Sequence, residues 1–130
     1  MKVVILAGGL GTRLVEYTKS MPKPMVKVGG LPIIHHIILH YKKYGLRSFI
    51  IASGYKGIII KKYFKKKLKD LDIKVINTGL KTMTGGRIKR LKKYLNNETF
   101  LLTYGDGISN VNIRKLIKFH KKNKKIATLT

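Results

Sequence analysis

Cysteine is absent from the 130-residue sequence, which excludes disulfide bonds and thiolate zinc sites. The sequence also lacks an apolar run of the roughly 18 residues that a membrane-spanning helix requires. Both absences fit a cytoplasmic protein, and we expect that location. Apolar residues nevertheless make up 44% of the chain, an ordinary share for a globular protein. The chain therefore has enough apolar surface to bury the core of one domain.

Acidic residues are scarce, since five Asp and Glu oppose 29 Lys and Arg and give a formal net charge of +24. One interpretation is a polyanionic partner, such as nucleic acid or an anionic membrane. The other is compositional drift, because the chain is rich in Lys, Ile and Asn and its lysines lie along expected helix faces such as Ile58–Leu68. Net charge bears on solubility and non-specific binding rather than on the fold, so both interpretations stay open.

Short apolar runs alternate along the chain with segments of helical spacing. The expected strands are Lys2–Ala7, Ser48–Ala52, Ile73–Ile76, Thr99–Thr103 and Ile126–Leu129. The expected helices are Ile33–Tyr44, Ile58–Leu68, Gly85–Leu95 and Asn112–Lys122, with a short one beginning in Thr12–Lys19. This alternation predicts an α/β fold whose mostly parallel sheet is covered on both faces. Because the last expected strand is interrupted at Thr130, we expect a fragment truncated at the C-terminus.

Glycine-rich loops follow the expected strands, at the edge of a parallel sheet where ligands gather. In the first loop, Gly8–Gly11, glycines permit positive φ and bring backbone N–H groups close to an anion. The loop matches neither standard phosphate motif, because the P-loop lysine is absent and Leu14 occupies the third glycine position of the dinucleotide fingerprint. The loop therefore indicates phosphate binding without assigning a family, and a tight structural turn remains the alternative.

Three charged residues near these loops are candidates for phosphate and metal binding. Arg13 closes the first loop, and its guanidinium can fork onto phosphate oxygens. Lys23 adds a second cation whose backbone is fixed by Pro22 and Pro24. Asp106 lies between glycines just past an apolar strand, where it is either a magnesium ligand or a turn aspartate that caps the next segment.

The segments "LAGGLGTRL…PKPM", "TMTGGR" and "TYGDG" resemble the motifs of the sugar-1-phosphate nucleotidylyltransferases, and among these the cytidylyltransferases. The similarity runs the length of the chain. It implies a three-layer α/β/α Rossmann-like nucleotidyltransferase fold in which residues 1–130 are the N-terminal nucleotide-binding part. It also implies cytidylyl transfer from CTP to α-D-glucose 1-phosphate, with Mg²⁺, to give CDP-glucose and pyrophosphate. The alternatives are another sugar-1-phosphate nucleotidylyltransferase, an inactive fragment, or a basic polyanion-binding module.

The resemblance implies roles for individual residues. Arg13 and Lys23 would be catalytic, and Asp106 would bind Mg²⁺. The implied nucleotide contacts are Leu6, Ala7, Gly8, Gly9, Leu10, Gly11, Thr12, Arg13, Lys23, Thr82, Arg87 and Gly105. The segment from Lys65 to Thr78 is shorter than in the family, where the additional residues take part in subunit contacts and in the sugar side of the site. The sugar and a homo-oligomeric state therefore stay open.

Overall fold

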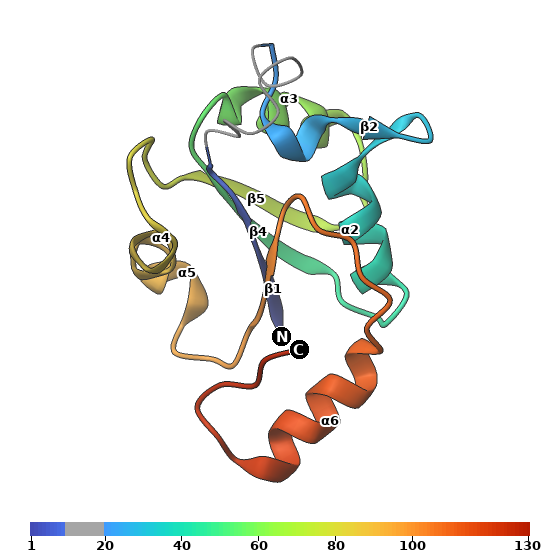
Figure 1. The fold of residues 1–130 in the computed structure, drawn as a ribbon, viewed down its shortest axis with the longest axis vertical. Coiled ribbons are helices and arrows are strands. Elements are labelled where there is room, and N and C mark those ends of the chain that lie inside the picture. The colour runs from blue at the N-terminus through green and yellow to red at the C-terminus, as the bar shows by residue number, and fades with distance from the viewer. Residues whose placement is uncertain (10–19) are drawn as a thin grey trace.

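The computed structural model describes residues 1–9 and 20–130. Within these residues, four strands form one parallel sheet in the order β5-β4-β1-β6. The strands are β1 (Lys2–Ala7), β4 (Ser48–Ser53), β5 (Asp72–Asn77) and β6 (Leu101–Tyr104). Figure 1 shows β1 inside the sheet, and the register aligns Ala7 of β1 with Ser53 of β4. The predicted α/β fold with a parallel sheet is confirmed.

Helices connect these strands, close to the predicted positions. They are α2 (Ile33–Lys42), α3 (Gly57–Lys66), α4 (Thr84–Arg90), α5 (Lys92–Leu95) and α6 (Ile113–Asn123). Before α2 come the 3₁₀ helix η2 (Lys23–Met25) and a short hairpin of β2 (Lys27–Val28) and β3 (Leu31–Pro32). Gly45, at φ +83°, follows α2 as the predicted stop, since glycine adopts positive φ without a Cβ penalty.

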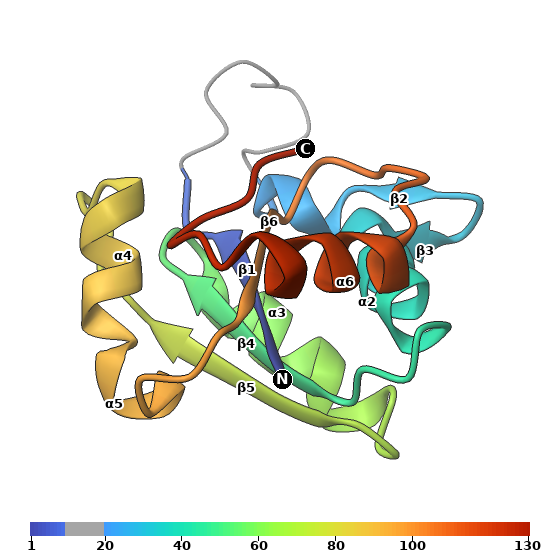
Figure 2. The same ribbon diagram turned by 90° about the horizontal axis from the view of Figure 1, so that it is seen from below.

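Alternating side chains of β1 supply two separate apolar clusters, one on each face of the sheet. Val3 and Ile5 pack in a cluster that includes buried residues of α2 and α3. Val4 and Leu6 pack in the other, which includes Leu91, between α4 and α5, and Leu95 of α5. Figure 2 shows α4 and α5 on the opposite side of the sheet from α2 and α3. The predicted three-layer α/β/α arrangement is therefore present.

The prediction of a strand at Ile126–Leu129 is wrong, because the structure has no strand there. Ile126 and Leu129 are almost fully exposed, at 105% and 93% of their reference areas. The segment returns to α6 instead, where Thr128 Oγ1 lies 2.9 Å from His120 Nδ1. A strand gains its hydrogen bonds from a neighbour, so β-forming residues alone do not make one. The short helix expected in Thr12–Lys19 lies outside the described residues, and no described helix is long and apolar enough to cross a membrane.

Candidate nucleotide and magnesium site

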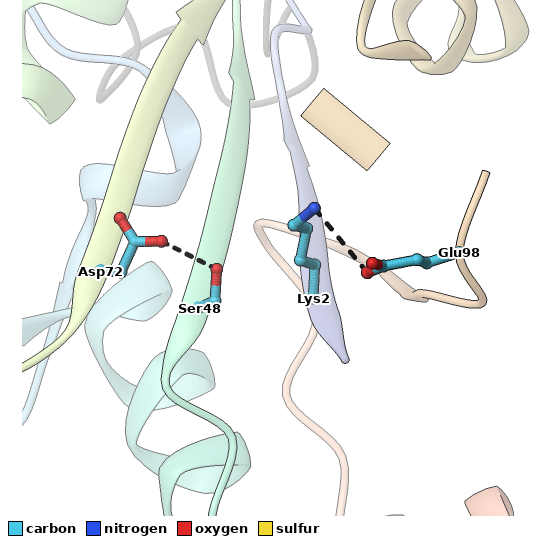
Figure 3. A network of polar contacts seen from close by, with 4 residues as sticks. All are labelled: Lys2, Ser48, Asp72 and Glu98. Carbon is cyan, nitrogen blue, oxygen red and sulfur yellow. Dashed lines mark hydrogen bonds and ion pairs between the residues drawn. The ribbon is translucent and has the colours of Figure 1, made fainter. Parts of the chain in front are cut away.

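The described acidic residues are divided between the two ends of the sheet. Figure 3 shows two contacts at the amino ends of the strands, where the Ser48 hydroxyl donates to Asp72 at 2.9 Å and Lys2 Nζ lies 3.8 Å from Glu98. Asp70 lies at this same end, just before β5. Among the described acids, Asp106 alone follows the carboxyl end of a strand. The carboxyl end is the edge at which open α/β sheets bind ligands.

Lys23 and Asp106 form an ion pair at this edge, although they are far apart in the sequence. The Nζ of Lys23 lies 2.6 Å from Oδ2 of Asp106, and the two side chains are 32% and 35% exposed. Lys23 begins η2, in which the Met25 N–H donates to the Pro22 carbonyl at 2.8 Å. Pro24 and Met25 are buried, so the turn that carries Lys23 is anchored in the core. A cation and a carboxylate that were both predicted from the sequence thus meet on a rigid support.

Gly105 sets the position of Asp106 against the end of β1. Its N–H donates to the Leu6 carbonyl at 2.9 Å. A Cβ on Gly105 would lie 3.1 Å from both the Leu6 carbonyl oxygen and Pro24 Cγ, which is tighter than most real contacts. The absence of a side chain therefore lets β6, β1 and the η2 turn come together. The predicted residues Leu6, Gly105, Lys23 and Asp106 lie in one neighbourhood.

The donor set at this edge fits a magnesium ion that arrives with a triphosphate. No group of three or more His, Cys, Asp or Glu side chains that could hold a metal is found in residues 1–9 and 20–130. Asp106 is a single, partly exposed carboxylate beside a lysine. Mg²⁺ is commonly held by one or two carboxylates together with substrate phosphates, rather than by a cage of protein ligands. Asp106 therefore fits a magnesium site that phosphate oxygens complete.

Arg87 lies on the β5 side of this edge and is only 5% exposed. Its Nη2 donates to the Gly8 carbonyl at 2.7 Å, and its Nη1 donates to Thr78 Oγ1 at 2.7 Å and to the Gly79 carbonyl at 2.8 Å. Burial lowers the pKa of Arg87, and the nearby charge of Arg90 lowers it further. In this structure both terminal nitrogens of Arg87 donate to protein oxygens. The expected contact of Arg87 with nucleotide stays a prediction.

The other predicted contacts lie around the same edge. Leu6 and Ala7 are buried at the end of β1, Gly8 is buried after them, and Gly9 is exposed. Thr82, in the loop before α4, accepts a 2.8 Å hydrogen bond from Arg90. The remaining predicted contacts lie outside the described residues: Leu10, Gly11, Thr12 and Arg13.

Two polar residues in this region were not predicted from the sequence. Thr78 is fully buried and Ser53 is 3% exposed. The Thr78 hydroxyl donates to the Ser53 carbonyl at 2.8 Å, and the Ser53 hydroxyl donates to the Ile76 carbonyl at 3.1 Å. No motif marks either residue, and the only signal is that each stands at the end of an expected apolar strand.

Comparison with known proteins gives the family. The family model described as "Nucleotidyl transferase" matches residues 2–130. The chain is 44% identical to glucose-1-phosphate cytidylyltransferase of Salmonella typhimurium, over all of this chain and 60% of that protein. It is 43% identical to the probable glucose-1-phosphate cytidylyltransferase of Bacillus subtilis, over all of this chain and 59% of that protein. The chain thus spans about 60% of the length of these curated relatives.

Solved structures show the same fold. HddC from Yersinia pseudotuberculosis, solved in complex with GMP-PN, is 32% identical with a TM-score of 0.78, covering 92% of this chain and 53% of that one. A putative glucose-1-phosphate thymidylyltransferase from Bacillus anthracis has a TM-score of 0.83 over 95% of this chain and 51% of that one, and at 23% identity it supports the fold alone. The family match and the relatives together show that the chain belongs to the nucleotidyl transferase family.

Proposed function

We propose that this chain is the N-terminal nucleotide-binding part of an enzyme that transfers a cytidylyl group from CTP to glucose 1-phosphate, giving CDP-glucose and pyrophosphate. The observation that carries the proposal is the Lys23–Asp106 ion pair, at 2.6 Å, next to Gly105, whose N–H donates to the Leu6 carbonyl of β1. The pair sets a lysine beside a carboxylate at the edge where open α/β sheets bind ligands, which supports a phosphate-binding role for Lys23 and a magnesium-binding role for Asp106. The choice of CTP and glucose 1-phosphate is supported by the cytidylyltransferases to which the chain is 43–44% identical.

Each residue of the proposed site has a distinct part. Residues Leu6 to Leu10, at the end of β1 and just after it, line the nucleotide pocket, and Thr82 and Gly105 contact the nucleotide from the neighbouring loops. Gly11, Thr12 and Arg13 bind the triphosphate, and Lys23 contacts phosphate near the reacting centre. Asp106 holds Mg²⁺, which when bound neutralises negative charge on the phosphates.

The proposed reaction is an in-line displacement at phosphorus. An oxygen of the sugar phosphate forms a bond to the α-phosphorus of CTP, and the bond from that phosphorus to the bridging oxygen of pyrophosphate breaks. The attacking phosphate is already an anion, so no general base is needed. The cations Arg13 and Lys23 then contribute by positioning the phosphates and by stabilising the charge that develops on the leaving pyrophosphate.

Calorimetric titration with nucleoside triphosphates tests the proposal. We expect CTP to bind more tightly than ATP, GTP or UTP, and binding to require Mg²⁺. Arg13→Ala should weaken CTP binding by about 1.5–3 kcal/mol, the contribution of a hydrogen bond to a charged group. Arg47→Ala is the matched control, because Arg47 is an exposed guanidinium that pairs with Asp70 before β5. Equal affinity for all four nucleotides, unchanged by Arg13→Ala, would contradict the proposal.

A second candidate, a polyanion-binding surface, is favoured by the basic face of α3. Four lysines of this helix are exposed: Lys61, Lys62, Lys65 and Lys66. Binding through such a face would fall steeply with salt and be indifferent to the base, because it depends on counterion release from phosphates. Repeating the titration at increasing salt separates the two candidates, since a shallow slope with a preference for CTP excludes the polyanion surface.

A further inference from the structure

Backbone carbonyls at or just beyond the carboxyl ends of three neighbouring strands converge on the Arg87 guanidinium. After β1, Gly8 accepts from Nη2 at 2.7 Å. At the end of β4, Ser53 accepts from Nη1 at 3.3 Å. After β5, Gly79 accepts from Nη1 at 2.8 Å and Leu80 from Nη2 at 3.4 Å. One side chain from α4 thus connects the chain just beyond the carboxyl ends of β1, β4 and β5.

Thr78 completes this group of contacts, which we call the Arg87 cluster: Arg87, Thr78 and the carbonyls of Gly8, Ser53, Gly79 and Leu80. The Thr78 hydroxyl accepts from Arg87 at 2.7 Å and donates to the Ser53 carbonyl at 2.8 Å. Its backbone N–H also donates to the Ser53 carbonyl at 2.8 Å. Because Thr78 is fully buried, water does not compete for these bonds, and the cluster is geometrically specific.

Glycines leave the space that the cluster occupies. A Cβ on Gly8 would overlap the Arg87 guanidinium. A Cβ on Gly54 would lie 2.6 Å from the Gly8 carbonyl oxygen and 2.8 Å from the Gly79 carbonyl oxygen. Gly8 therefore serves close packing against Arg87, in addition to any role in approaching a phosphate.

The charge of Arg87 has an unusual environment. Buried charges are normally paired with an opposite charge. Among the described residues no carboxylate forms an ion pair with Arg87, and carbonyl dipoles are its partners. An apolar residue would fill the same space without the cost of burying a guanidinium. A guanidinium that is buried among carbonyl groups therefore points to a fixed hydrogen-bond geometry at Gly8, just after β1, as what Arg87 supplies.

We propose that Arg87 is a positioning residue that holds Gly8, and with it the start of the phosphate-binding loop, in the conformation that accepts the triphosphate of CTP. The inference rests on the proposed function for its ligand. It differs from the role that the family resemblance implies, because Arg87 acts through the Gly8 carbonyl rather than by touching the nucleotide. Lysine cannot replace it, since an ammonium group lacks the planar fork that serves Gly8 and Thr78 together.

The test follows the Gly8 amide resonance in ¹⁵N-labelled protein together with calorimetric titration of MgCTP. The variants are Arg87→Lys and Arg87→Ala, with Arg47→Ala as the control. We expect Arg87→Lys to shift the Gly8 resonance in the free protein and to weaken MgCTP binding by about ten- to a hundredfold, the range seen when a supporting contact is lost.

Guanidinium ion, well below unfolding concentrations, should restore MgCTP binding to Arg87→Ala, whereas sodium chloride at equal ionic strength should not. Arg47→Ala should change neither measurement.

Each outcome supports or overturns the inference. Weakened binding with an unmoved Gly8 resonance would overturn it and show that Arg87 contacts the nucleotide directly. An unmoved resonance with unchanged binding would overturn it as well. If Arg87→Ala does not fold, Arg87→Lys alone decides between these outcomes. If the wild-type chain binds no MgCTP, the proposed function fails, while the Gly8 resonance still shows whether Arg87 positions the loop.

Discussion

Two adjacent glycines just after β1, Gly8 and Gly9, offer a matched pair of substitutions. A Cβ on Gly8 would overlap the Arg87 guanidinium and would still lie 2.8 Å from its Nε, whereas a Cβ on Gly9 would meet no atom of residues 1–9 and 20–130 within 4 Å. Neither glycine has a positive φ that would itself strain an alanine. Gly8→Ala and Gly9→Ala therefore add the same methyl group at neighbouring positions, and only the first displaces Arg87.

The magnitude follows from the contacts that Arg87 would lose. To admit the methyl group, the guanidinium must leave the Gly8 carbonyl and Thr78 Oγ1, both 2.7 Å away. Hydrogen bonds to charged groups contribute about 1.5–3 kcal/mol each, and an overpacked core methyl costs about 1–3 kcal/mol. Relaxation of the surrounding side chains recovers part of the lost hydrogen-bond and packing energy. We therefore expect Gly8→Ala to lower the free energy of unfolding by about 2–4 kcal/mol. Gly9→Ala should stay within about 0.5 kcal/mol of the wild type.

Urea denaturation followed by circular dichroism measures both variants, and an unchanged m-value shows that the midpoint reports stability. The double variant Gly8→Ala/Arg87→Met is the control, because the methyl group then meets no guanidinium. It should be little less stable than Arg87→Met alone, since contacts already lost cannot be lost again. Equal stability of Gly8→Ala and Gly9→Ala would refute the packing of Gly8 against Arg87.

Two further predictions concern charge. Asp106→Asn should change the free energy of unfolding by less than about 1 kcal/mol, because the ion pair with Lys23 is partly exposed, yet it should remove the Mg²⁺-dependent part of CTP binding. Urea denaturation and calorimetric titration on the same samples measure the two effects. MgCTP binding equal to that of the wild type would exclude Asp106 as the magnesium ligand. Burial, and then the charges of His36 and Lys67, lower the pKa of His35, so the unfolded chain takes up this proton at higher pH than the folded one. The contribution of His35 to stability should therefore be full above the unfolded value of 6.5 and decrease as the pH falls from there toward the lowered folded value. Denaturation across this pH range should show a smaller decrease in His35→Gln than in the wild type, and an equal decrease in both would contradict the assignment.

The fold was predictable from the sequence because its signals are local. Apolar runs such as "SFIIA" mark strands that are buried on both faces, and Gly45 marks the end of α2 at positive φ. The position of Asp106 at the same edge of the sheet as the glycine-rich loops, where it meets Lys23, was also predictable from the sequence. The sequence places Asp106 directly after an expected strand, and the carboxyl ends of parallel strands meet at one edge of a sheet.

The Arg87 cluster was not predictable in the same way. The principal partners of Arg87 are backbone carbonyls, which every residue carries, so no residue type in the sequence marks them. Thr78 looks like an ordinary polar residue after a strand, and its complete burial depends on how the loops pack. The failed strand at Ile126–Leu129 has a related cause, because strand formation depends on a non-local partner as well as on β-forming residues.

Paramagnetic broadening by Mn²⁺ tests the central claim most directly, because it locates the metal–nucleotide complex on the folded chain. Mn²⁺ replaces Mg²⁺ in a complex with CTP, and amide signals of the ¹⁵N-labelled protein are followed as it is added. We predict that the strongest broadening centres on Asp106 and Gly105, extends to Gly8, and disappears in Asp106→Asn. Broadening centred on the lysines of α3, or unchanged in Asp106→Asn, would contradict a nucleotide site at the carboxyl end of the sheet.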